Sequence, residues 1–333
     1  MRDAFVRELF KAAKSNSNIH LITGDLGFGV LTKFEASYPE QYTNAGVAEQ
    51  NMTGLAAGLA MNGFKVFTYS IGNFSTLRCL EQIRNDVCYH GLDVTIISIG
   101  GGFSYGSLGY SHHATEDLSI LRSLPGLSVY VPGCVWETAE ITAHLLDKPG
   151  PKYLRLDKSG VQSTRVLDER FEFERLRLVP EAGAKSSSSL DVLIVAAGGI
   201  LEEALTASSI LRNKGLACRV MSAHSLKPFD TDGLLSSARR ASAIFSLEEN
   251  VIEGGLGSLV AEQLLEGGVW PKKFGRLGIR ATSLTSLVGD QKYLRESHGL
   301  LGSQIAPKIL GDLDLVGKHE KLPYVSPSHQ AGI

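Results

Sequence analysis

The chain contains 333 residues, of which 43% are hydrophobic and 20% charged; this excludes a disordered protein and favours two globular α/β units with separate cores. The formal net charge is −2 and no basic block occurs, so neither nucleic acid nor an anionic membrane is an expected partner. No apolar run reaches the roughly 18 residues of a membrane span, and the N-terminus has an amphipathic helix pattern, which favours a cytoplasmic protein over a secreted one.

Apolar runs rich in Val and Ile alternate with helical patterns in the first half of the chain. Such runs are typical of strands that are buried on both faces of a parallel sheet, and the helical patterns between them close on Gly or Pro. The expected strands are 18–25, 65–70, 93–102, 127–133 and 152–157, and the expected helices are 1–16, 46–63, 74–91 and 135–150. This alternation predicts a doubly wound, parallel-sheet α/β domain.

From Val161 to Leu190 the alternation gives way to charged residues, a proline and a run of serines, which predicts a linker. Strand and helix patterns then resume, beginning with a strand at 191–199 and a helix at 201–215, and they predict a second, smaller α/β domain. We therefore divide the chain into a first domain at 1–165, a linker at 166–189, a second domain at 190–316 and a tail at 317–333.

Two features of the sequence carry no expected chemistry. The four cysteines lack Cys-x-x-Cys spacing, so we expect small buried residues and no metal site at Cys79, Cys88, Cys134 and Cys218. The glycines at 254–257 precede a helix whose N-terminus could bind an anion, but a tight strand-to-helix turn is the interpretation that we favour.

Glu49 is the residue most distinguished by its surroundings. It opens a helical pattern made largely of Ala, Gly, Leu and Met, so its carboxyl must be exposed, paired, or kept protonated by desolvation. Composition alone favours a simpler interpretation, in which Glu49 stabilises the first turn of its helix through the helix dipole.

The segment G-V-A-E-Q-N-M-T-G-L-A-A-G-L-A around Glu49 resembles the pyrimidine-binding motif of the transketolase family. The resemblance runs from about Leu21 to about Leu310 in the family's order, with a pyrimidine-binding domain first and a C-terminal domain second. It implies that Glu49 is catalytic and binds thiamine diphosphate. In that family the glutamate hydrogen-bonds N1′ of the aminopyrimidine and promotes the imino tautomer, which removes the thiazolium C2 proton.

Two more segments resemble cofactor-binding parts of the family. T-G-D-L-G implies that Asp25 lies at the cofactor, although an aspartate in such a turn is also common as a loop or cap residue. Y-S-I-G-N-F-S-T-L-R implies that the Phe74 ring stacks on the aminopyrimidine, the alternative being a core phenylalanine under the helix. Arg78, one turn later, is a candidate for substrate binding.

The segment G-Y-S-H-H-A-T-E-D, followed by R-S-L-P-G, is the second strong match. It implies that His112 is the active-site histidine, which stabilises or protonates the substrate oxygen, and that His113 contacts the substrate. A metal-binding or surface pair is the alternative, but two histidines give too few ligands for a structural zinc site. K-Y-L-R-L-D-K-S-G places Lys158 where relatives bind a sugar phosphate through arginine, although an exposed lysine before a turn is nearly as good an interpretation.

The pocket departs from that of a housekeeping transketolase at two positions. The resemblance aligns Leu108 with an aspartate that recognises a hydroxyl of the donor sugar, and Gly100 with a family histidine. These departures leave the identity of the substrate open, and the residues that match the cofactor site remain.

The Gly-Asp-Gly motif through which the family binds Mg²⁺ and the cofactor's diphosphate does not occur in this sequence. The resemblance therefore implies a partner polypeptide, an N-terminal transketolase subunit that carries the diphosphate and Mg²⁺. We expect an α2β2 heterotetramer that transfers a two-carbon ketol or acyl unit from a ketose-type sugar or sugar-phosphate donor to an aldehyde acceptor. The β subunit of a 2-oxoacid dehydrogenase component and a non-catalytic scaffolding subunit are the alternatives.

Overall fold

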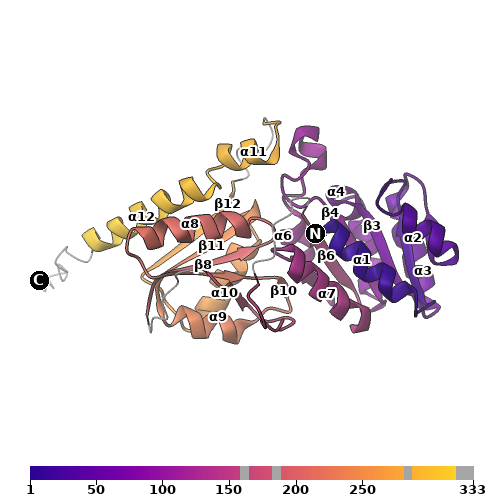
Figure 1. Ribbon diagram of the computed structural model, residues 1–333, viewed down its shortest axis with the longest axis horizontal. Helices are drawn as coiled ribbons and strands as arrows, with labels where there is room; N and C mark the ends of the chain where they lie inside the picture. The colour runs from indigo at the N-terminus through magenta and orange to yellow at the C-terminus, as the bar shows by residue number, and fades with distance from the viewer. Residues whose placement is uncertain (158–164, 182–188, 281–286, 320–333) are drawn as a thin grey trace, which may run out of the picture.

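The computed structural model describes residues 1–157, 165–181, 189–280 and 287–319. Two sheets with helices on both faces lie one after the other along the molecule (Figure 1). The helices are α1 (Arg2–Ala13), α2 (Thr32–Ser37), η1 (Pro39–Gln41), α3 (Glu49–Met61), α4 (Gly72–Ser75), α5 (Leu80–Gln82), η2 (Ile83–Cys88), η3 (Gly106–Leu108), η4 (Tyr110–His112), α6 (Asp117–Ser123), α7 (Val135–Asp147), α8 (Leu201–Asn213), α9 (Thr231–Ala238), α10 (Leu256–Glu266), α11 (Gln291–Ser297) and α12 (Gly302–His319).

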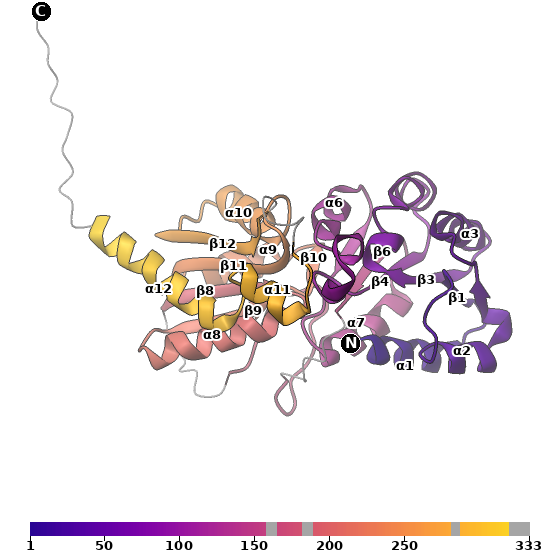
Figure 2. The same cartoon turned by 90° about the horizontal axis from the view of Figure 1, so that it is seen from above.

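The strands of the first sheet are β1 (Ile19–Thr23), β2 (Tyr42–Asn44), β3 (Lys65–Ile71), β4 (Val94–Ile99), β5 (Ser128–Tyr130), β6 (Lys152–Leu156) and β10 (Ser225–Lys227). Their spatial order is β10-β5-β6-β4-β3-β1-β2, and every neighbouring pair is parallel except β10 with β5. Helices α1 and α7 cover one face of this sheet, and α3 and α6 cover the other (Figure 2). Strands β1, β4 and β6 are buried along their whole length, as their continuous apolar runs predict, whereas the edge strand β2 is partly exposed.

The second sheet has five strands in the order β12-β11-β8-β9-β7. Its strands are β7 (Arg177–Leu178), β8 (Leu190–Ala197), β9 (Cys218–Ser222), β11 (Ala241–Val251) and β12 (Lys273–Ile279). Helices α8 and α12 pack on one face, and α9 and α10 lie on the opposite face (Figure 1). The predicted fold class, a doubly wound parallel-sheet domain followed by a smaller α/β domain, is therefore confirmed.

The two domains share structure at their junction. Strand β10 belongs by sequence to the second domain but pairs with β5, so it extends the first sheet. The Glu249 side chain on β11 accepts a hydrogen bond from the backbone N–H of Phe103 at 2.6 Å, and Arg155 on β6 donates to the Glu249 backbone oxygen at 2.8 Å. The first bond connects the second domain to the loop that follows β4, and the second connects it to β6.

One predicted helix is interrupted. The segment 74–91 forms α4, α5 and the π-helix η2 instead of a single α-helix. The Ser75 and Thr76 hydroxyls hydrogen-bond to backbone oxygens of the preceding turn, which competes with regular helix formation. The segment predicted as a linker includes β7, which pairs with β9, so part of it adds an edge strand. Its role as a linker stays a prediction.

Three of the four cysteines are buried and Cys88 is partly buried, and all four are free thiols. Burial raises the pKa of Cys88 to about 11 and that of Cys218 to about 12, so these thiols are unreactive at neutral pH. Among the described residues, no helix is both long enough and apolar enough to cross a membrane.

Candidate active site

The candidate site lies at the carboxyl edge of the first sheet, where ligands of open α/β sheets bind. Asp25 follows β1, the loop before Glu49 follows β2, and Phe74 follows β3. His112 follows β4 through the loop that contains η3 and η4. Because β4, β3, β1 and β2 are neighbours in the sheet, residues that are far apart in sequence meet at one edge.

Glu49, Arg78, Phe74 and His112 form a continuous chain of contacts at this edge. Arg78 Nη1 lies 2.6 Å from Glu49 Oε2, and the Arg78 guanidinium lies 4.7 Å from the centroid of the Phe74 ring. The Phe74 and His112 rings meet edge to face with centroids 5.1 Å apart. The structure therefore brings together four of the seven predicted site residues.

Glu49 is 3% exposed although it carries a carboxyl group. The sequence allows this carboxyl group to be exposed, paired or kept protonated. The structure shows it paired, with Arg78 as its partner. Gly24 leaves room for the Glu49 stem, because a Cβ atom at position 24 would lie 3.3 Å from Glu49 Cγ. A side chain at that position would crowd the carboxyl group.

Asp25 is an exposed residue at the end of β1 with a left-handed backbone (φ 55°). The Asn44 side chain accepts hydrogen bonds from the backbone N–H groups of Asp25 at 2.9 Å and Gly46 at 3.0 Å, and it donates to Asp25 Oδ1 at 3.1 Å. Asn44 therefore fastens the Asp25 turn to the loop that leads into Glu49. No motif in the sequence pointed to Asn44.

The two adjacent histidines have different surroundings. His112 is partly exposed, and its Nδ1 lies 3.0 Å from the Ser111 hydroxyl oxygen. His113 is 1% exposed, packs edge to face on Phe103, and lies 3.2 Å through Nε2 from the Gly106 oxygen. His113 thus braces the loop behind His112, and its predicted contact with substrate stays a prediction.

Asn73 is a site residue that sequence reasoning missed. Its side-chain amide donates to the backbone oxygens of Ser111 at 3.2 Å and Tyr110 at 3.5 Å. Since Asn73 directly precedes Phe74, these bonds fix the histidine loop against the turn that carries the aromatic ring. A polar residue between the strand and Phe74 was the only signal in the sequence.

Gly100 and Leu108, the two positions that depart from the family's pattern, lie in the loop that follows β4. A Cβ atom at Gly100 would lie 2.2 Å from the Tyr105 ring, and the residue has φ +87°, so Tyr105 fills the space that a side chain at this position would take. Leu108 is 55% exposed on η3. Nearby, the Tyr110 hydroxyl donates to Glu116 Oε1 at 3.0 Å, and this bond raises the pKa of Tyr110.

Two further candidates remain. One of them, Lys158, lies outside the described residues. The glycine turn before α10 already binds an acidic side chain of this protein, because the Glu248 carboxyl group accepts the N–H groups of Leu256 at 2.7 Å and Gly257 at 2.8 Å. This turn is therefore already occupied, in agreement with the structural interpretation of these glycines.

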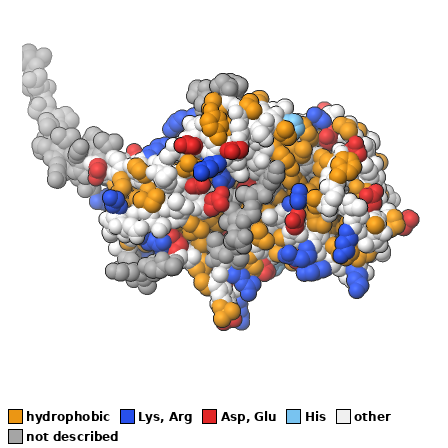
Figure 3. All heavy atoms as spheres, turned by 45° about the horizontal axis from the view of Figure 1, so that its top comes forward, with side chains coloured by type: hydrophobic (Ala, Val, Ile, Leu, Met, Phe, Trp, Pro, Cys, Tyr) orange, Lys and Arg blue, Asp and Glu red, His pale blue; other side chains and the backbone are white. Residues whose placement is uncertain are grey.

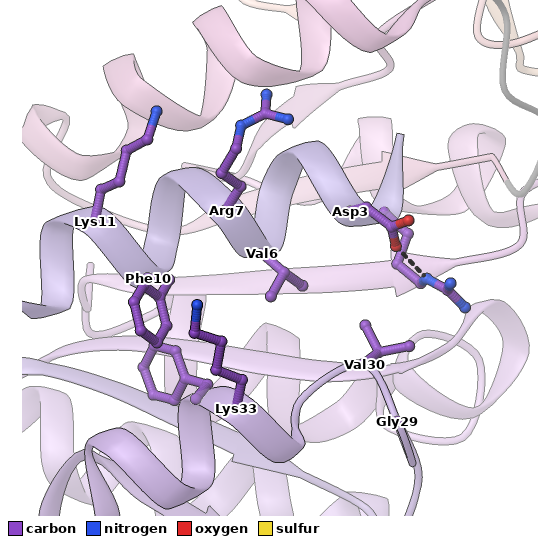
Figure 4. Close-up of a pocket in the computed structure, with 10 residues that line it drawn as sticks. Asp3, Val6, Arg7, Phe10, Lys11, Gly29, Val30 and Lys33 are labelled. Carbon is purple, nitrogen blue, oxygen red and sulfur yellow. Dashed lines mark hydrogen bonds and ion pairs between the residues drawn. The ribbon is translucent and has the colours of Figure 1, made fainter.

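A cavity of about 390 Å³ lies between α1 and the start of α2, away from the predicted site residues (Figure 4). Its basic side chains are largely neutralised. Arg2 pairs with Asp3 at 3.0 Å, and Glu8 pairs with both Arg7 and Lys11 at 3.0 Å. We assign this cavity no ligand.

Comparison with known proteins identifies relatives over nearly the whole chain. Residues 1–163 match the family "Transketolase, pyrimidine binding domain", and residues 182–300 match "Transketolase, C-terminal domain". One of the subunits of the apulose-4-phosphate transketolase of Phocaeicola vulgatus is 34% identical over 80% of this chain and 84% of its own. The 6-deoxy-6-sulfo-D-fructose transketolase subunit SqwH of Clostridium sp. (strain MSTE9) is 33% identical over 92% of each chain.

A solved structure described as "Split gene transketolase, inactive beta4 tetramer" is similar over 94% of this chain and 98% of its own. The TM-score is 0.80 and the sequence identity is 34%. Both family matches and these near full-length similarities confirm the family that the sequence motifs predicted, and the family implies thiamine diphosphate as cofactor. This chain belongs to the transketolase family and is the smaller, C-terminal-type subunit of a split transketolase-like enzyme, a transferase that acts with a partner subunit.

Proposed function

We propose that this chain supplies the pyrimidine-binding half of a thiamine diphosphate site and that the two-chain enzyme transfers a two-carbon ketol unit from a ketose-type donor to an aldehyde acceptor. The observation that supports this most is the contact chain from Glu49 through Arg78 and Phe74 to His112. An acid, an aromatic face and an imidazole lie close together at one edge of the sheet, and the proposed chemistry uses all three.

The residues present fit the aminopyrimidine half of the cofactor. A flat, nitrogen-bearing group, the Arg78 guanidinium, is already held against the Phe74 ring and hydrogen-bonded to Glu49. Phe74 would hold the aminopyrimidine by stacking, and Glu49 would hold it by a hydrogen bond. Thiamine diphosphate held there would supply a nucleophilic carbon for reaction with the ketose carbonyl.

His112 acts on the substrate side of the site in this proposal. It donates a hydrogen bond or a proton to the substrate oxygen as the carbonyl becomes an alcohol. Ser111 lies 3.0 Å from Nδ1 and orients the ring, while the backbone of the histidine loop is fixed by Asn73. Asp25 is exposed and is a cofactor-binding candidate, and its turn is held by hydrogen bonds with Asn44.

The partner polypeptide holds the diphosphate and Mg²⁺ in this proposal. The exposed face of α3 supports such an assembly, since a Cβ atom at Gly54 or Gly58 would meet nothing within 4 Å and the neighbouring Leu55 and Met61 are 42% and 56% exposed. Hydrophobic side chains also gather on the visible surface of the first domain (Figure 3). We propose an α2β2 heterotetramer, because the related structure that contains only β chains is described as inactive.

The proposed donor is a ketose with an anionic group. The two relatives are named for apulose 4-phosphate and 6-deoxy-6-sulfo-D-fructose, both of which are anionic sugars. Leu108 offers an apolar surface where the family's aspartate recognises a hydroxyl, so the donor differs from that of a housekeeping transketolase. Lys158 remains a candidate for the anionic group.

The test begins by co-purifying this chain with a neighbouring-gene product that contains Gly-Asp-Gly. Ketoses are then screened for thiamine-dependent cleavage, with 2-oxoacid decarboxylation as the competing activity. Glu49→Gln should abolish ketol transfer without preventing complex formation, and Glu40→Gln, at an exposed glutamate, serves as the control. Full activity in Glu49→Gln would indicate a scaffolding role, and decarboxylation alone would indicate the 2-oxoacid alternative.

A further inference from the structure

Arg78 occupies an unusual position between the site's acid and its aromatic ring. It lies in the interruption between α4 and α5, and 46% of its side chain is exposed. Its guanidinium nevertheless reaches the carboxylate of Glu49, whose side chain is only 3% exposed, and lies over the face of Phe74. Nearly half of the side chain is thus exposed, although its guanidinium lies in the candidate cofactor site.

The two contacts of the guanidinium match those expected of the cofactor's ring. Guanidinium is planar, delocalised and rich in N–H donors, so it stacks on aromatic faces and bonds carboxylates. An aminopyrimidine is also planar and nitrogen-bearing, and under the proposed function it needs the same ring face and the same carboxyl group. Both cannot be present at once, because the guanidinium lies 2.6 Å from Glu49 and 4.7 Å from the centroid of Phe74.

We infer that Arg78 is a placeholder that occupies the aminopyrimidine position in the cofactor-free chain and must move away before the cofactor can bind. This inference rests on the proposed function, since it requires that Glu49 and Phe74 hold that ring. It gives Arg78 a role different from the substrate contact that the sequence suggested.

The burial of Glu49 and the partial exposure of Arg78 explain how Arg78 can occupy the site and then leave it. A buried carboxylate without a partner is strongly unfavourable, and Arg78 offsets this cost while the cofactor is absent. Because nearly half of the Arg78 side chain is already exposed, its guanidinium reaches solvent by rotation of the side chain alone. The apparent affinity for the cofactor is then reduced by the fraction of molecules in which Arg78 occupies the site.

The experiment measures the dissociation constant of thiamine diphosphate, with Mg²⁺ present, for the reconstituted two-chain complex by isothermal titration calorimetry. Arg78→Gln should bind the cofactor about tenfold more tightly, because the competing cation is gone. Arg78→Lys keeps the charge but loses the flat guanidinium, so its affinity for the cofactor should lie between those of the wild type and Arg78→Gln. Arg84→Gln is the matched control, since Arg84 is exposed six residues further on and bonds Asn85. Its affinity should equal that of the wild type.

A second measurement uses the full-length chain without cofactor. Arg78→Gln should lower its melting temperature, because Glu49 loses its partner, and Arg84→Gln should not. Unchanged or weaker cofactor binding in both Arg78 variants would overturn the inference, and weaker binding would show that Arg78 assists the cofactor instead. If the wild-type complex and every variant fail to bind thiamine diphosphate, the proposed function itself is wrong. Should Arg78→Gln not fold, Arg78→Lys decides the question alone.

Discussion

Replacing Glu249 with Gln tests how strongly the second domain supports the loop next to the candidate site. The Glu249 carboxylate is 3% exposed and accepts hydrogen bonds from Arg295, Gln291 and the backbone N–H of Phe103. A Cβ atom at Gly102 would lie 2.5 Å from Glu249 Cγ, so the carboxylate stem is packed directly against the glycine loop. Glu249→Gln keeps the shape of the side chain and removes its charge.

Breaking one side of a buried ion pair costs about 3 to 5 kcal/mol of unfolding free energy. We expect the lower end, about 3 kcal/mol, because Arg295 keeps its contact with Glu202 and the glutamine oxygen still accepts the Phe103 N–H. The control is Glu262→Gln, because Glu262 also makes an ion pair between the domains, with Arg122 at 2.8 Å, but is 48% exposed. A pair at the surface contributes less than about 1 kcal/mol.

Urea unfolding of the full-length chain, followed by circular dichroism, measures both variants against the wild type. A Glu249→Gln variant no less stable than Glu262→Gln would refute this prediction, since burial would then not decide the strength of these ion pairs. The same variant should lower the turnover of the reconstituted complex, because the glycine loop leads directly into the histidine loop.

Three further predictions follow from single residues. Asn73→Ala should lower kcat of the complex about tenfold, because the loop that carries His112 is released, and it should change cofactor affinity less than twofold. Steady-state kinetics measures kcat and calorimetry measures the affinity; equal losses in kcat and affinity would contradict this prediction. Burial raises the pKa of Glu248 from 4.5 to about 7, so the unfolding free energy of the wild type falls as pH rises between these two values. Glu248→Gln should remove this pH dependence, which amounts to at most about 3 kcal/mol in urea unfolding at several pH values. An unchanged pH dependence in the variant would show that Glu248 does not cause it. Gly100→His should destabilise the chain by at least about 2 kcal/mol in the same assay, because of the positive φ and the Tyr105 ring, and wild-type stability would contradict this.

The sequence predicted those parts of the fold that depend on local patterns. Buried strands such as β4 and β6 are continuous apolar runs, and α7 has helical periodicity closed by a proline. It did not predict that β10 joins the first sheet, because three residues carry no signal of a distant partner. The interruption of the helix at 74–91 was missed because the competing Ser75 and Thr76 hydrogen bonds are invisible in periodicity.

In the candidate site, too, the sequence predicted single residues but not the contacts between them. Family motifs located Glu49, Phe74 and His112, and the strand order then brought them to one edge. The pairing of Glu49 with Arg78 depends on a contact between residues 29 positions apart, and no local pattern encodes it. Asn73 lies within a segment that matched the family, but its bonds to the histidine loop required the fold.

The most direct test of the account is a crystal structure of the two-chain complex with thiamine diphosphate and Mg²⁺. We expect the Glu49 carboxyl group within about 3 Å of the pyrimidine N1′, the ring against Phe74, and the Arg78 guanidinium turned away. The diphosphate and the metal should be bound by the partner chain. A cofactor bound far from Glu49, with its pyrimidine ring elsewhere in the complex, would contradict the central claim.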